Sequence, residues 1–196
     1  MTQLIGRVTR CSTRGFVGAL RLPEPNIPTF GAFCLAEAQQ GQSQVVGLIY
    51  DLSVPDDEFA RQIAASEAAT AEQIADHQQN RQIPVEFSAL AVGYRHNDEY
   101  RQSLPPQPPL PLAAINRMSS QAVLDFSERL DFLALIVNAP QLPGDELMSA
   151  ALINAATVRP EDEQRRFLIE AGRQISQLLG HDIIRLDRVL AGLRPE

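Results

Sequence analysis

The fold of this chain is decided by three short apolar segments near its start, each interrupted by a glycine. They are Leu4-Ile5-Gly6-Arg7-Val8, Phe30-Gly31-Ala32-Phe33-Cys34-Leu35 and Val45-Val46-Gly47-Leu48-Ile49-Tyr50-Asp51-Leu52. Each segment is too short for an amphipathic helix and rich in β-branched or aromatic residues. A glycine inside such a segment marks a bend or a close approach of another backbone. The three segments therefore predict the strands of a small closed β-barrel.

A fourth apolar segment predicts a further strand of the same barrel. It is Pro84-Val85-Glu86-Phe87-Ser88-Ala89-Leu90-Ala91-Val92-Gly93-Tyr94. Because successive side chains of a strand point to opposite faces, Val85, Phe87 and Ala89 share one face and Leu90 and Val92 the other. With the turn-rich stretches between the segments, the pattern indicates a barrel of about six strands.

The residues 56–80 interrupt the strand pattern with a predicted helix. Asp56, Asp57 and Glu58 would lie in its first turn, where the helix dipole favours negative charge. This role explains the three acids without a bound cation. Since the apolar stripe of the segment is thin, we expect a helical excursion that faces solvent.

A proline-rich stretch then separates the barrel from a different kind of sequence. Residues 104–112 read Leu-Pro-Pro-Gln-Pro-Pro-Leu-Pro-Leu, which neither a helix nor a central strand accommodates. We expect an extended strap packed on the barrel, although such a segment is also able to serve as a ligand for aromatic grooves. The predicted boundaries are residues 1–112 for the barrel with its strap and 118–196 for a helical domain.

Beyond residue 118 the apolar residues follow a helical period. The pattern predicts helices over about 119–138, 145–156, 161–179 and 182–193, of which the third begins at Arg159-Pro160-Glu161-Asp162-Glu163. In the last helix Ile183, Leu186, Leu190 and Leu193 form a narrow seam, which we expect to pack inside the bundle. The predicted class is α+β, a closed barrel followed by a C-terminal helical bundle.

The barrel segment resembles the barrel shared by HerA-type ATPases and the N-terminal domain of ATP synthase α and β subunits, the HAS-barrel family. The similarity rests on Gly6, Gly31 and Gly47 with their apolar flanks, on the 85–94 strand and on the proline strap. It implies a barrel that holds assemblies together or docks partner proteins. The ATPase core of that family requires a lysine-bearing phosphate loop, which this sequence does not contain.

Composition narrows the function further. The 196 residues carry a net charge of -7, and all 17 basic residues are arginine. The absence of lysine excludes Schiff-base chemistry and the Gly-x-x-x-x-Gly-Lys phosphate loop, and the acidic balance makes nucleic acid an unlikely partner. The sequence shows neither a membrane span nor a secretory signal, so we expect a cytoplasmic protein in which Cys11 and Cys34 stay reduced.

No motif predicts catalytic, cofactor-binding or metal-binding residues. The three histidines, His77, His96 and His181, lack the spacing of metal ligands and are expected in exposed turns or helix ends. Residues 15–18, Gly-Phe-Val-Gly, lack the context of a phosphate-binding loop and fit a strand bend better. We therefore expect no cofactor.

The favoured hypothesis is a non-enzymatic interaction module that binds a separate ATPase, HerA-like or other, or its own copies. One alternative is a small metal-dependent hydrolase that uses His96, Asp98 and Glu99. The other is a barrel that binds single-stranded nucleic acid through an arginine patch. The arginines near the first strand are Arg7, Arg10, Arg14 and Arg21. The spacing of Arg7, Arg10 and Arg14 does not place all three on one face of a regular strand, so no binding of oligonucleotides is expected at physiological salt.

Overall fold

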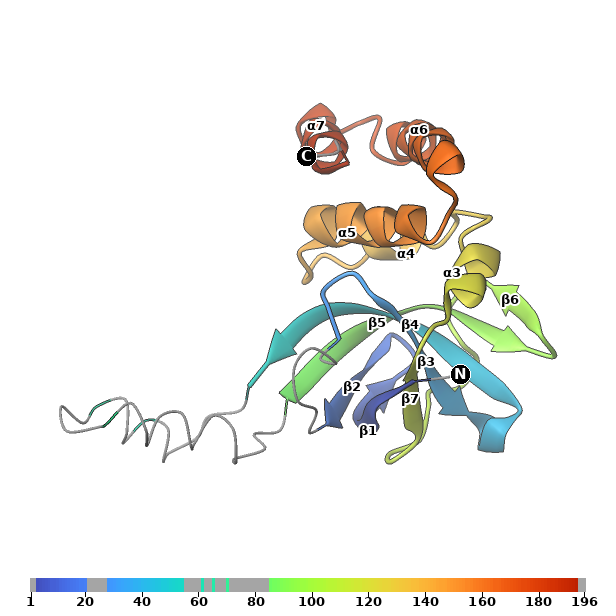
Figure 1. Cartoon of the computed structure of the whole chain (residues 1–196), viewed down its shortest axis with the longest axis vertical. Coiled ribbons are helices and arrows are strands. Elements are labelled where there is room, and N and C mark those ends of the chain that lie inside the picture. Colours follow the sequence, from blue (N-terminus) through green and yellow to red (C-terminus); the bar gives the residue numbers. More distant parts are fainter. Residues whose placement is uncertain are drawn as a thin grey trace.

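The chain forms a closed β-barrel with helices stacked on one side of it (Figure 1). The computed structural model describes residues 3–20, 28–54, 61, 65, 70 and 85–193. Its strands form one antiparallel sheet in the order β2-β1-β7-β3-β4-β5-β6, and an additional pairing of β2 with β5 closes six of them into the barrel. The strands are β1 (Leu4–Ser12), β2 (Gly15–Leu20), β3 (Phe33–Ala38), β4 (Ser43–Ser53), β5 (Val85–His96), β6 (Glu99–Arg101) and β7 (Ala114–Arg117). The expected α+β class, with about six barrel strands, is confirmed.

The interior of the barrel contains two phenylalanine rings packed among smaller apolar side chains. Phe16 and Phe87 are both buried there. A Cβ atom on Gly47 would lie 2.5 Å from Cζ of Phe16, and one on Gly18 would lie 2.4 Å from Cζ of Phe87. These glycines are therefore required because the ring tips occupy the space of their missing side chains.

The outer face of β3, β4 and β5 is also buried, because the helices cover it. In β5, Phe87 and Ala89 belong to the barrel interior, whereas Leu90 and Val92 belong to the core beneath the helices. The alternation predicted for this strand is thus confirmed. A strand with two buried faces is continuously apolar, as the 89–92 stretch is.

The barrel ends five residues later than expected. Residues 104–112 contain no helix or strand, which agrees with the extended strap, but the chain then adds β7, which pairs with both β1 and β3. The predicted end of the barrel at residue 112 therefore leaves out one of the six barrel strands. The strap is tied to β1 where it ends, since Leu112 N donates to Val8 O at 2.7 Å and Val8 N donates to Ala113 O at 3.0 Å.

Five helices follow the barrel where four were expected. They are α3 (Ser120–Phe126), α4 (Leu133–Val137), α5 (Gly144–Thr157), α6 (Glu161–Leu178) and α7 (Ile183–Gly192), and a single 3-10 turn, η1 (Gln39–Gly41), lies in the barrel. The predictions for α5, α6 and α7 agree with the structure within a few residues. The single helix predicted over 119–138 is wrong, because it is divided into α3 and α4.

The side chain of Gln102 explains this break. Its Nε2 atom donates to Phe126 O at 2.6 Å and to Arg129 O at 2.9 Å, while Phe132 N donates to its Oε1 at 2.9 Å. Each of these backbone groups would otherwise need a partner within a continuous helix. One amide from the barrel side thus replaces the helical hydrogen bonds between α3 and α4.

The last helix is anchored to α5 by a buried carboxylate. Asp145 accepts from Nε and Nη2 of Arg185 at 2.9 and 2.8 Å and from Nη1 of Arg188 at 3.1 Å. The α7 seam packs inside the bundle through Leu186, Leu190 and Leu193, but Ile183 is 75% exposed and does not join it.

Several sequence predictions fall outside the described residues. They include most of the 56–80 helix, with the acids at positions 56–58, and also His77 and Arg21.

Candidate binding cleft

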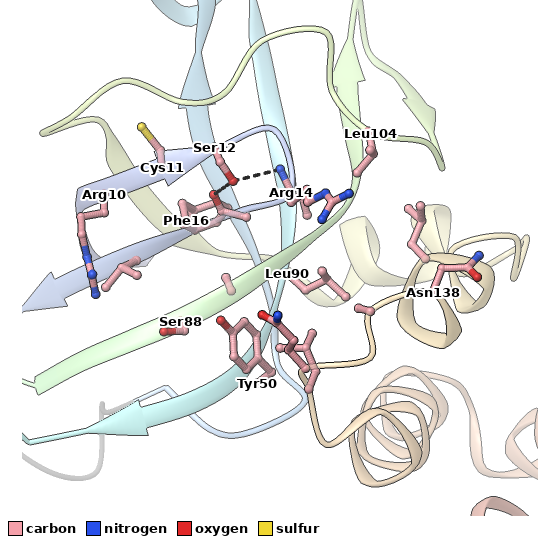
Figure 2. A pocket seen from close by; sticks show the side chains of 18 of the residues that line it. Arg10, Cys11, Ser12, Arg14, Phe16, Tyr50, Ser88, Leu90, Leu104 and Asn138 are labelled. Carbon is pink, nitrogen blue, oxygen red and sulfur yellow. Dashed lines mark hydrogen bonds between the residues drawn. The ribbon is translucent and has the colours of Figure 1, made fainter. Parts of the chain in front are cut away.

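A hollow with a volume of about 690 Å³ lies between the barrel and the helices. The barrel side is formed by the β1–β2 hairpin, by Tyr50 of β4, by residues 88–91 of β5 and by Leu104 of the strap. Leu135 of α4 and residues 138–142, which connect α4 to α5, form the opposite wall. In Figure 2, Arg10 and Arg14 stand on the hairpin side and Asn138 on the helical side of the cleft, with Tyr50 and Leu90 between them.

A bulge in β1 places the first of these arginines. Val8 pairs with Gly18 and Arg10 pairs with Val17, so Thr9 is an extra residue in the strand. Because the bulge shifts the alternation by one residue, Arg7 and Arg10 both follow the outer face, opposite to the buried Val8. The expectation from regular strand spacing, which separated these two arginines, is therefore corrected.

The hairpin turn fixes the backbone of the second arginine. Arg14 N donates to Oγ of Ser12 at 3.2 Å, and this hydroxyl donates to Gly15 O at 3.4 Å. Ala91 N of β5 donates to Arg14 O at 2.9 Å, which ties the turn to the neighbouring strand. Figure 2 shows the guanidinium of Arg14 projecting from this turn.

Three arginines of the predicted patch are among the described residues, and they do not share one site. Of these three, Arg10 and Arg14 line the cleft. Nη1 of Arg7 instead donates to Leu112 O at 3.0 Å and so fastens the strap to the barrel. The expectation that oligonucleotides do not bind stays a prediction.

The cleft is positively charged in an acidic protein. No aspartate or glutamate is among its described lining residues, and neither guanidinium forms a hydrogen bond or ion pair with any described residue. The nearest acid in the sheet register is the exposed Asp51, which pairs with Ser88 but does not line the cleft. Among the described residues, the two cations thus have no partner.

A second, smaller hollow of about 440 Å³ has the opposite charge. It lies between β6 and the α3–α4 connection, and its six charged residues comprise four acids and two arginines. Burial raises the pKa of Tyr100, which lines this hollow, and the nearby Arg95 opposes that effect. Gln102, which also lines this hollow, is already bound to three backbone groups.

The residues of the hydrolase hypothesis lie at the tip of the β5–β6 hairpin. His96 pairs with Glu99, and Asn97 and Asp98 form the two-residue turn with φ angles of 49° and 64°. The carboxylate of Asp98 is paired with Arg95, and of the three candidates only Glu99 lines the second hollow. The structure therefore brings these residues near each other in a solvent-exposed turn but not into a cleft.

The remaining candidates behave as structural residues. His181 is exposed between α6 and α7, and residues 15–18 form part of β2. Both cysteines are free, and burial raises the pKa of Cys34 far above that of an ordinary thiol. Within the described ranges no group of three or more His, Cys, Asp or Glu residues has the arrangement of a metal site.

The cleft could not be found from the sequence because its walls come from five separate segments.

Comparison with known proteins adds no assignment, since no family model matches the chain and no curated protein matches it significantly. Among the described helices, none has the length and apolar character needed to cross a membrane.

Proposed function

We propose that this chain is a non-enzymatic interaction and assembly module that works in the cytoplasm. In this proposal its barrel, of the type shared by HerA and ATP synthase, docks on a separate ATPase. The closed barrel and the strap packed along it are compatible with such a role, which needs a rigid surface rather than reacting groups.

The observation that carries the proposal is an apolar turn at the end of the strap. Ala113 N donates to Leu110 O at 3.0 Å, which closes a β-turn over Pro111 and Leu112. Leu112 has a φ angle of 68°, in the left-handed region where a turn of this kind favours glycine. Yet Leu110 is 60% exposed and Leu112 is 72% exposed.

A leucine at this position is unfavourable for the isolated chain in two ways. Its backbone is strained by about 1–2 kcal/mol, on the scale typical of a left-handed residue, and its apolar side chain faces water. Strain of this kind is maintained where the surrounding structure holds it and is concentrated at functional positions. The hydrogen bonds to Val8 and Arg7 hold the turn, so it can present both leucines to an apolar groove on a partner protein.

The test compares wild type with the double variant Leu110→Ser and Leu112→Asn. Asparagine tolerates a positive φ, so the turn should remain folded. Tagged protein is used to capture partners from its native host, and mass spectrometry identifies them. We expect wild type to recover a defined partner, an ATPase in the favoured case, and the double variant to lose it.

The control variant is Ile183→Ser with Ile184→Ser, because these residues are 75% and 76% exposed on α7. It removes a comparable apolar surface elsewhere and should keep the partner. Failure of wild type to recover any protein, combined with a strictly monomeric state by light scattering, would contradict the proposal. Self-association that the strap variant abolishes would instead identify the partner as a second copy.

A further inference from the structure

We propose that the cleft between the β1–β2 hairpin and the α4–α5 connection binds a small organic anion with an apolar body. The acidic end of the ligand would contact Arg10 or Arg14, and its apolar part would lie against leucines from both sides of the cleft. This inference goes beyond docking of a partner, since it assigns a small-molecule site to the joint between barrel and helices.

The charge of the cleft selects an anion. The chain as a whole carries -7, yet the described lining of this hollow contains two arginines and no acid. At physiological ionic strength charges are screened beyond about 8 Å, so acids elsewhere on the chain have little effect on the cleft. Asp51 is the nearest acid in register and lies outside the lining.

Strand pairing and turn hydrogen bonds fix the backbone at both arginines. Arg10 follows the bulge of β1, and Arg14 lies in a turn held by Ser12 and by Ala91. Four residue steps separate them, so their Cα atoms lie within about 13 Å of each other. Each guanidinium can donate two parallel hydrogen bonds to a carboxylate, sulfonate or phosphate. Because Figure 2 shows the two guanidiniums apart from one another, either of them can hold the acidic group of a small molecule.

The rest of the cleft selects an apolar body. Leu90 and Leu104 line the barrel side, and Leu135 and Leu142 line the helical side. Leu104 is 44% exposed, so a ligand can cover apolar surface that now faces water. A volume of about 690 Å³ falls within the range of small-molecule sites, which are found preferentially between domains. Tyr50 and Asn138 add polar groups that can orient a ligand.

The experiment is a calorimetric titration of the intact protein with 2-naphthoate and with 2-naphthalenemethanol. The two probes share one apolar body, and only the first carries a negative charge. We expect 2-naphthoate to bind with a stoichiometry of one and at least tenfold more tightly than the alcohol. Because the ligand bridges barrel and helices, 2-naphthoate should also raise the melting temperature.

The variant Arg10→Ser with Arg14→Ser should weaken the binding of 2-naphthoate at least tenfold and leave the affinity for the alcohol unchanged. Arg10→Lys with Arg14→Lys keeps the charges but not the paired donors, so it should retain part of the binding. The matched control is Arg165→Ser with Arg166→Ser, which removes two exposed arginines from α6 and should bind like wild type. Circular dichroism of each variant verifies the fold.

Three results would each overturn the proposal. One is equal affinity for the acid and the alcohol, another is no heat of binding for 2-naphthoate, and the third is an equal loss in the α6 control. None of them depends on capturing a partner protein, so the test is independent of the docking role proposed above.

Discussion

The barrel interior and the core beneath the helices are both buried, but they are filled in different ways. The interior combines two phenylalanine rings with glycines, with five buried branched residues and with five buried alanines. The branched residues are Ile5, Val8, Val45, Ile49 and Ile115, and the alanines are Ala32, Ala36, Ala38, Ala89 and Ala91. The core beneath the helices is built around the rings of Phe33, Phe126 and Phe132, whose centroids lie 5.4 to 5.8 Å apart. The first core is limited by the space inside a small barrel, whereas the second depends on large side chains that fill the gap between two layers.

The largest effect is expected from separating the two layers. A cut after Arg117 would expose the outer faces of β3, β4 and β5, on which Leu35, Leu48 and Val92 are almost fully buried in the intact chain. We expect fragments 1–117 and 118–196 to lose their cooperative thermal transitions, as measured by circular dichroism. A β-rich spectrum and a cooperative melt of fragment 1–117 would show instead that the barrel interior suffices for folding.

The next effect is expected from a cavity beneath the helices. Phe126 is 1% exposed and contacts Phe33, Phe132 and Tyr100 by edge-to-face or tilted ring packing. Phe126→Ala should lower the free energy of unfolding by about 3–5 kcal/mol, since a large ring is lost from a packed site. Denaturant titration measures the loss, and Phe126→Leu should cost less because it refills part of the space. Similar losses of unfolding free energy for the two variants would contradict the argument that the side-chain volume at position 126 stabilises this core.

A smaller loss is expected from adding one methyl group inside the barrel. Gly47→Ala would place Cβ 2.5 Å from Cζ of Phe16, and overpacking of this kind costs about 1–3 kcal/mol. Phe16→Leu in the same chain should recover part of the loss, because it removes the ring tip that clashes. A double-mutant cycle measures this coupling.

The control for this prediction is Gly172→Ala in α6. There Cβ would lie 3.4 Å from Cδ2 of Leu190, an ordinary contact, and alanine favours a helix by about 0.5–1 kcal/mol over glycine. A neutral or stabilising result is expected. If Gly47→Ala and Gly172→Ala destabilised the protein equally, the lack of space for a methyl group would not be specific to the barrel interior.

The same contrast explains which parts of the fold could be predicted from the sequence. The alternation of Phe87 and Ala89 with Leu90 and Val92 is local, because a strand reverses its side-chain direction at every residue. This alternation can therefore be predicted from the local sequence, without knowing that helices cover one face of the strand. The strand β7 was missed because it is four residues long and only Ile115 within it is buried.

The candidate cleft could not be predicted, since long-range contacts create it. The bulge at Thr9 that turns Arg10 outward is set by pairing with β2, and regular spacing of β1 alone gives the wrong face for that arginine. The break between α3 and α4, which is followed by the helical wall of the cleft, depends on an amide supplied by Gln102. Neither event leaves a local signature in the sequence.

The smallest change is a chemical one, and it compares the barrel interior with the edge of the barrel. Cys34 is fully buried in the barrel interior, where its thiol donates to Gly47 O at 3.5 Å, while Cys11 is only half-buried at the barrel edge. Burial raises the pKa of Cys34, so it stays protonated in mildly alkaline solution, and only a thiolate attacks a disulfide reagent. Ellman's reagent should therefore modify Cys11 in the native protein and both cysteines after denaturation. The variant Cys11→Ser should show no native reaction, and rapid modification of Cys34 in that variant would mean that the barrel interior opens to solvent.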